Sequence, residues 1–133
     1  MNSEKFTEKS IGAISGAHEF ATKYGHGSIK IEHLLLALVS QMEGLIPKIL
    51  EKMGKDVSRF ISKIEAELNR FSKVSGGNLY MDSSLAKVLD NAEKEAKNYG
   101  DSYVSVEHLF LAILKEKISL VESEGIFLKE FEK

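Results

Sequence analysis

A pattern that occurs twice constrains this chain more than any other feature. Tyr-Gly at positions 24–25 is followed, after six residues, by Glu-His-Leu-Leu-Leu-Ala-Leu at 32–38. The arrangement returns in the second half of the chain, with Tyr-Gly at 99–100 and Glu-His-Leu-Phe-Leu-Ala-Ile at 107–113. When position 32 is aligned with position 107, nine of the thirty-two aligned pairs that begin at position 7 are identical. An internal repeat predicts two copies of one structural unit, and so two copies of any binding surface.

Helical periodicity dominates both copies. Apolar residues recur at helical spacing at Ile14, Ala17, Ala21 and Tyr24, and again at Leu85, Leu89, Ala92, Ala96 and Tyr99. Thr7 and Asp82 precede these stripes as N-cap residues, and Gly25 and its counterpart Gly100 stand where the helices should stop. The next helix of each unit carries the Glu-His motif. Ser105 suits its N-cap in the second unit, whereas Lys30 in the first does not.

Two further helices are expected in each unit. The segment 45–53 predicts a third helix, and Asp56 should cap a fourth whose apolar side includes Phe60. Gly125 and Phe131 repeat the spacing of Gly54 and Phe60, which predicts a fourth helix in the second unit as well. The third helix of the second unit should be about one turn shorter than that of the first. The last helix is expected to be truncated, as if the sequence had been cut from a longer protein.

These elements predict an all-α fold, in which two four-helix repeats pack with approximate two-fold symmetry. Residues 1–133 should form a single domain, with repeat one at about 4–71, a linker at about 72–81 and repeat two at about 82–133. The linker contains Ser-Gly-Gly-Asn, which is typical of a turn. Its apolar residues should pack back onto the units; they are Phe71, Val74, Leu79 and Tyr80. In the first helix, Gly12 and Gly16 should permit close helix packing.

Composition excludes several classes of function. The chain has no cysteine, which fits a reducing compartment, and its net charge of −2 with interspersed signs does not indicate a nucleic-acid or membrane surface. The longest apolar run, 34–39, is far too short to span a bilayer, and the N-terminus does not resemble a signal peptide. We therefore expect a soluble, cytoplasmic domain.

No catalytic signature is present, since the chain lacks a phosphate loop and a cysteine nucleophile. His18 and His26 are expected to be solvated, and His33 and His108 to lie at the rim of the core with local hydrogen bonds. Adjacent Glu and His side chains point about 100° apart on a helix, which disfavours a metal site. An enzyme or metal protein that uses the two Glu-His pairs is the remaining alternative of a different class.

Glu32 and Glu107 fall in the first turn of their helices, where unpaired N–H groups and the helix dipole favour a carboxylate. A purely structural role at the helix start is one interpretation. The other is a polar site for a cationic group, formed with Thr7 or Asp82. Asp101 would add acidity to the second site, while its counterpart in the first is a histidine, so the two sites should not be equivalent.

The double unit, with its motifs at 31–38 and 100–109, resembles the duplicated N-terminal domain of the Clp/Hsp100 unfoldases. The similarity covers nearly the whole chain. The segments 68–77 and 92–101 resemble the ClpB disaggregase branch, and the opening 6–9 is also similar to the ClpC branch.

The resemblance implies a mobile, non-catalytic domain joined by a linker to hexameric AAA+ rings that bind ATP outside this chain. The isolated domain should be a monomer without a cofactor or metal. Its partners would be unfolded or aggregated polypeptides, and also adaptor proteins, but not nucleic acid or membranes. Positions that match the family's substrate contacts are Thr7, Leu89, Asp101 and Glu107. Positions that are leucine in some ClpB grooves are Asn91, Glu95 and His108 here, which tells against a purely hydrophobic groove.

The ClpC branch implies an alternative site. Thr7, Glu32 and Glu107 match positions that bind phosphorylated arginine, and the domain would then dock adaptors or phosphoarginine-tagged substrates. Asp82 stands where a second threonine is expected. A carboxylate there would repel a phosphate, so a symmetric pair of phosphoarginine sites is not expected.

Overall fold

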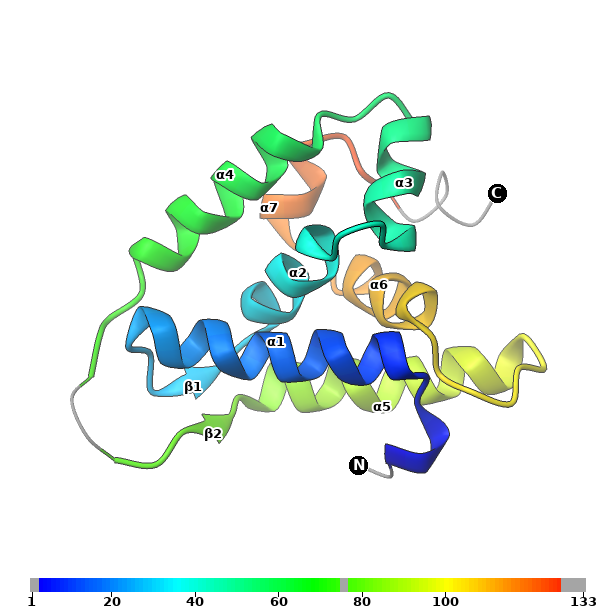
Figure 1. The fold of residues 1–133 in the computed structure, drawn as a ribbon, viewed down its shortest axis with the longest axis horizontal. Helices are drawn as coiled ribbons and strands as arrows, with labels where there is room; N and C mark the ends of the chain where they lie inside the picture. Colours follow the sequence, from blue (N-terminus) through cyan, green and yellow to red (C-terminus); the bar gives the residue numbers. More distant parts are fainter. Residues whose placement is uncertain (1–2, 75–76, 128–133) are drawn as a thin grey trace.

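A computed structural model describes residues 3–74 and 77–127, whose regular secondary structure is almost entirely helical (Figure 1). The elements, in chain order, are a 3₁₀ turn at Ser3–Lys5, α1 at Glu8–Tyr24, β1 at Ser28–Ile29, α2 at Ile31–Ser40, α3 at Leu45–Lys52, α4 at Val57–Asn69, β2 at Tyr80–Met81, α5 at Ser83–Asn98, α6 at Val106–Lys115 and α7 at Ser119–Glu122. The all-α prediction is confirmed.

The two motif-bearing helices form the centre of the molecule. Residues 33–39 of α2 and residues 108–114 of α6 are all buried, because both helices are apolar on every side. The first helix of each repeat packs on its own partner, α1 on α2 and α5 on α6, while α2 and α6 also contact each other. In Figure 1, α1 and α5 run in opposite directions across the same side of this core. A helix of such composition is stable only inside the packed domain.

Among the described residues, each helix by itself is too short or too polar to cross a membrane. In the same described part of the chain, α2 and α3 together reach the required length and composition, and they are bent by 80° where they join.

The third helices confirm the expected difference between the repeats. α3 has eight residues and α7 has four, so α7 is about one turn shorter. The predicted fourth helix of repeat two falls largely on residues 128–133, which lie outside the described part of the chain.

The predicted helix caps at Thr7, Asp56 and Asp82 are confirmed. The Thr7 hydroxyl accepts from the Ser10 N–H at 3.2 Å, and Asp82 accepts from the Ser84 N–H at 3.1 Å. Asp56 caps α4 in the same way, accepting from the Arg59 N–H at 3.0 Å. Each carboxylate or hydroxyl satisfies an N–H that has no partner within the helix. At the other end of α1, Gly25 has φ 74°, a conformation that glycine adopts without steric cost.

The beginning of each repeat is tied to the other repeat by backbone hydrogen bonds. Tyr80–Met81 of β2 pairs in parallel with Ser28–Ile29 of β1, and a single bridge joins Phe6 to Val104. These contacts also hold the linker. Its residues Phe71 and Leu79 pack against the core as predicted, but the prediction was wrong for the side chains of Val74 and Tyr80, which are 53% and 63% exposed. Backbone bonding fixes that segment without burying every apolar side chain.

Gly16 lies where α1 crosses α2. A Cβ at this position would come within 3.2 Å of the Ala37 Cβ, whereas a Cβ at Gly12 would meet nothing closer than 3.9 Å. The prediction of close helix packing is therefore confirmed at Gly16.

This contrast gives a test. We expect Gly12→Ala to raise the free energy of unfolding by about 0.5–1 kcal/mol, because alanine loses less backbone entropy in a helix. Gly16→Leu should lower it by about 1–3 kcal/mol through overpacking. Urea denaturation of both variants measures the difference, and equal effects would contradict the assigned helix contact.

Candidate functional site

Thr7 meets the second repeat at the entrance to α6. Its backbone N–H donates to the Val104 carbonyl at 3.0 Å, and the Val104 N–H donates to the Lys5 carbonyl at 2.7 Å. Asp101 lies three residues before Val104, and Glu107 three residues after it, in the first turn of α6. The fold thus brings three predicted site residues, Thr7, Asp101 and Glu107, to one region that neither repeat could form alone.

The counterpart of this region lies at the entrance to α2. The Asp82 N–H donates to the Ile29 carbonyl at 2.9 Å, directly beside the β1–β2 pair. Glu32 stands in the first turn of α2, as Glu107 does in α6. Each region is therefore built from one helix start of each repeat, and the second one contains a carboxylate, Asp82, where the first has a hydroxyl.

Electrostatics separate the two regions further. Burial raises the pKa of Glu32, and the neighbouring carboxylates Glu67 and Asp82 add to that shift against the opposing Lys30 charge. Hydrogen bonds from Ser84 hold the pKa of Asp82 below its usual range. A surface with these carboxylates at a helix start favours a cation over an anion.

The histidines of the repeated motif act as helix caps. The backbone N–H of Lys30 donates to Nδ1 of His33 at 2.8 Å, and that of Ser105 donates to Nδ1 of His108 at 2.9 Å. Each imidazole thus takes the place that Glu or Gln holds in a capping box. Lys30 occupies the N-cap position of α2 but makes no side-chain cap bond, as expected for a residue type that caps helices poorly. The His33 imidazole accepts from the Lys30 N–H and so supplies one half of the capping box.

In the second repeat the capping histidine, His108, also forms a hydrogen bond with an aspartate, Asp101. Since Nδ1 of His108 accepts, Nε2 carries the proton and donates to Asp101 at 2.7 Å. His108 is buried, whereas the Asp101 side chain is half exposed. The aspartate therefore positions the imidazole while keeping one side toward solvent.

In the first repeat the same chain of bonds ends on a second histidine. His33 Nε2 lies 2.8 Å from Nδ1 of His26, so His33 donates and His26 accepts. The Nε2 atom of His26 is buried without a hydrogen-bond partner among the described residues. Burial lowers the pKa of His26. Burial also lowers the pKa of His33, to about 4, and the neighbouring charges of His26 and Lys30 are further causes of that shift. The prediction of a local hydrogen bond at His33 is confirmed, while the prediction of a solvated His26 was wrong.

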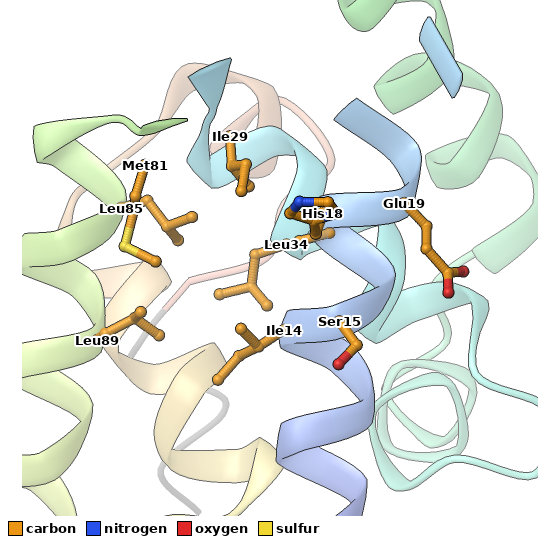
Figure 2. A pocket seen from close by; sticks show the side chains of 10 residues that line it. Ile14, Ser15, His18, Glu19, Ile29, Leu34, Met81, Leu85 and Leu89 are labelled. Atoms are coloured by element: carbon orange, nitrogen blue, oxygen red, sulfur yellow. The ribbon is translucent and has the colours of Figure 1, made fainter. Parts of the chain in front are cut away.

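A pocket of about 390 Å³ opens between α1 and α5. Figure 2 shows Ile14, Leu34 and Leu89 facing a common hollow, with Met81 and Leu85 beside them. Leu34 of α2 lies behind the two helices in this view. Leu89, the fourth predicted site residue, belongs to this pocket, whereas Asp101 lines a different one that also contains Lys5 and Val104. The structure therefore does not gather all four predicted residues into one site.

Two of the three polar positions expected to weaken a hydrophobic groove, Glu95 and His108, have charged partners. Glu95 is only 6% exposed and pairs with Lys115 across to α6, and His108 is held by Asp101. Asn91 is half-buried.

Sequence reasoning missed the His26–His33 pair and the part of the pocket formed by Met81 and Ile29. The alignment of the two repeats, which places His26 opposite Asp101, was the available signal for the pair. Within residues 3–74 and 77–127, no group of three or more His, Asp or Glu side chains could hold a metal ion.

Comparison with known proteins gives a consistent family. The model of the Clp repeat (R) N-terminal domain matches residues 5–124. The chaperone protein ClpB of Bdellovibrio bacteriovorus is 39% identical over 125 residues, which are 92% of this chain and 14% of that protein. ClpB of Nitratidesulfovibrio vulgaris is 39% identical over 136 residues, which are 98% of this chain and 16% of that protein. The chain thus spans only a small fraction of the length of these relatives.

Solved structures agree in fold. The Hsp104 N-terminal domain from Candida albicans superposes with a TM-score of 0.85 at 19% identity, covering 96% of this chain and 86% of that one. A ClpV N-domain in complex with a VipB peptide gives a TM-score of 0.72 at 18% identity, covering 91% of this chain and 79% of that one. With the family model matched over most of its length, this chain belongs to the Clp repeat N-terminal domain family and is a ClpB-like member of it.

Proposed function

We propose that this chain is the non-catalytic, substrate-engaging domain of a ClpB-type disaggregase in the cytoplasm. It would bind unfolded or aggregated polypeptides and pass them to ATP-binding AAA+ rings of a hexameric parent chain. The observation that carries the proposal is the apolar pocket between α1 and α5, which leaves Met81 38% exposed beside Leu85 and Leu89. An open apolar pocket on a folded domain marks a binding surface.

The similarity to a ClpV N-domain that was solved with a VipB peptide supports a polypeptide as ligand. The absence of a catalytic motif in the sequence is consistent with a binding role.

Thr7, Asp101 and Glu107 provide a polar contact region for the same ligand in this proposal. We expect Glu107→Ala to weaken binding of a denatured model protein by roughly fivefold, as loss of one half-exposed charged contact implies. Fluorescence anisotropy with reduced, carboxymethylated lactalbumin measures the affinity, and the melting temperature should stay within a few degrees. Exposed Glu122 gives the control Glu122→Ala, which should bind normally.

Unchanged affinity in Glu107→Ala would remove this residue from the binding site. A fall in both affinity and melting temperature would instead indicate that Glu107 only stabilises the start of α6. Failure of the unmodified chain to bind the denatured protein would contradict the proposed function itself.

One observation favours a second candidate, a ClpC-type domain that binds adaptors or phosphoarginine. Thr7 bonds to Val104 just before the start of α6, whose first turn contains Glu107, and the N–H groups at a helix start suit a phosphate. The acidic counterpart with Glu32 and Asp82 would repel it. Under this candidate, phosphoarginine should bind at a single site. That binding should be lost in Glu107→Ala, whereas Glu32→Ala should have little effect on it. Absence of saturable phosphoarginine binding would reject it.

A further inference from the structure

The apolar pocket between α1 and α5 contains an oxidisable side chain in its wall. Met81 is 38% exposed and lines the pocket together with Leu85 and Leu89. In Figure 2 the Met81 side chain runs past Leu85 toward Leu89, so its thioether sulfur lies along the wall of the hollow. Oxidation turns a methionine from a flexible apolar side chain into a polar sulfoxide. The pocket therefore contains a group whose polarity a chemical modification can change.

The backbone of Met81 is fixed independently of its side chain. Met81 is paired with Ile29 in the register of β1 and β2, and the next residue, Asp82, donates its N–H to the Ile29 carbonyl at 2.9 Å. The Asp82 side chain caps α5. A modification at the sulfur of Met81 therefore changes the pocket wall and leaves these backbone contacts in place.

The repeated sequence shows that the fold does not require a sulfur at this position. When the two repeats are aligned, Phe6 is the counterpart of Met81. The Phe6 side chain is 4% exposed, so its ring belongs to the core. The second repeat thus places a thioether at the edge of a pocket, where the first repeat has a buried aromatic ring.

The other methionines of the described residues provide a comparison. Met42 is 89% exposed in the loop after α2, and Met53 is half-buried at the end of α3. The residues that line the pocket include neither of them. Exposure alone should make Met42 the first to be oxidised, but only a sulfoxide at Met81 would lie in the pocket.

We propose that Met81 is a reversible oxidation site whose sulfoxide lowers the affinity of the pocket for apolar segments. The oxidant is a peroxide. The sulfur lone pair attacks one peroxide oxygen, the S–O bond forms as the O–O bond breaks, and the other oxygen leaves as water. A thiol-dependent sulfoxide reductase reverses the step, as two thiols become a disulfide and the oxygen leaves as water. This inference rests on the proposed polypeptide-binding function and adds a regulation of it.

The apolar surroundings explain the expected loss of affinity. The sulfoxide oxygen is a strong hydrogen-bond acceptor, whereas the neighbouring Leu85 and Leu89 side chains carry no donor. An apolar segment that covers the oxygen would remove its water without replacing those hydrogen bonds, which is unfavourable. We therefore expect the oxidised chain to bind reduced, carboxymethylated lactalbumin about tenfold more weakly than the untreated chain.

The test compares the unmodified chain with Met81→Leu and Met42→Leu, since leucine replaces methionine with little change in volume. Each chain is treated with hydrogen peroxide, the peroxide is removed with catalase, and lactalbumin binding is measured by fluorescence anisotropy. Mass spectrometry of peptides measures the sulfoxide at each methionine, and circular dichroism checks the fold. The unmodified chain and Met42→Leu should lose affinity, whereas Met81→Leu should bind equally before and after treatment. Methionine sulfoxide reductases A and B with dithiothreitol should restore the affinity.

The outcomes separate this inference from the proposed function. An equal loss of affinity in Met81→Leu and the unmodified chain would overturn the assignment to Met81. Unchanged affinity of a chain whose Met81 is oxidised would overturn the effect on the pocket, while polypeptide binding would stand. A Met81 that stays unoxidised when Met42 is fully converted would also overturn the inference. If the untreated chain does not bind lactalbumin, the proposed function fails, and its regulation fails with it.

Discussion

Lowering the pH from 7 to 4 is expected to destabilise the fold by about 3 kcal/mol through His33 alone. His33 is fully buried, and its pKa is lowered to about 4, from about 6.5 for an unperturbed histidine. Between these values the unfolded chain binds a proton that the folded chain excludes, so stability falls by about 1.4 kcal/mol per pH unit as the pH decreases. About one unit above pH 6.5 both states are neutral at this position and the effect vanishes.

The hydrogen bonds explain why the folded state cannot take up this proton. Nδ1 of His33 already accepts from the Lys30 N–H, and Nδ1 of His26 accepts from His33. A protonated imidazole donates from both nitrogens, so one of these two contacts would become a clash of two donors. Neutral histidines are thus built into the start of α2.

Urea denaturation at several pH values measures the effect, with variants that separate it from the titration of carboxylates. His33→Gln keeps an acceptor at the position used in capping boxes and should flatten the pH dependence by about 3 kcal/mol relative to the unmodified chain. His18→Gln replaces an exposed histidine and should leave the profile unchanged. If His33→Gln showed the same loss of stability toward pH 4 as the unmodified chain, the buried neutral pair would not be its source.

Phe110→Ala is expected to lower the free energy of unfolding by about 3–5 kcal/mol. Phe110 is fully buried on α6, which packs against α1, α2 and α3 of the other repeat as well as α5 of its own. Removing the ring leaves a cavity in the buried core, because the surrounding helices relax only partly around it. A loss of that size is a large part of the roughly 5–15 kcal/mol typical of a folded domain.

Phe127→Ala is the matched control, because Phe127 is 46% exposed. It should cost much less, about 1 kcal/mol or below. Thermal unfolding followed by circular dichroism compares the two. Similar effects of both substitutions, or a Phe110→Ala chain that melts in two separate steps, would contradict a single core shared by the repeats.

Sequence alone predicted most of the fold because its signals are local. Helical periodicity, the caps at Thr7 and Asp82 and the glycine after α1 each depend on residues close in the chain, and each appears where it was expected. The relation between the third helices also followed from spacing. The burial of His26 did not, because it depends on His33 and on the linker residue Phe71, whose ring centroid lies 5.5 Å from that of His26.

The candidate site was predictable only in part for a similar reason. Thr7, Asp101 and Glu107 were grouped by resemblance, and the Thr7–Val104 hydrogen bond shows how the fold brings them together. Leu89 was grouped with them but lines the pocket with Ile14, because side-chain direction depends on how α5 packs beside α1. The binding roles of all four residues remain predictions.

The reciprocal backbone ties have a consequence for the autonomy of a repeat. The start of repeat one bonds to Val104, and the start of repeat two bonds to Ile29, so each half lends its opening segment to the other. A self-complementary exchange of this kind is what two separate copies related by a two-fold axis would make. The linker therefore converts what would be a dimerisation, dependent on concentration, into a step within one chain. A repeat made on its own would need a second copy to complete its helix entrance, whereas the duplicated chain carries that partner with it at every dilution.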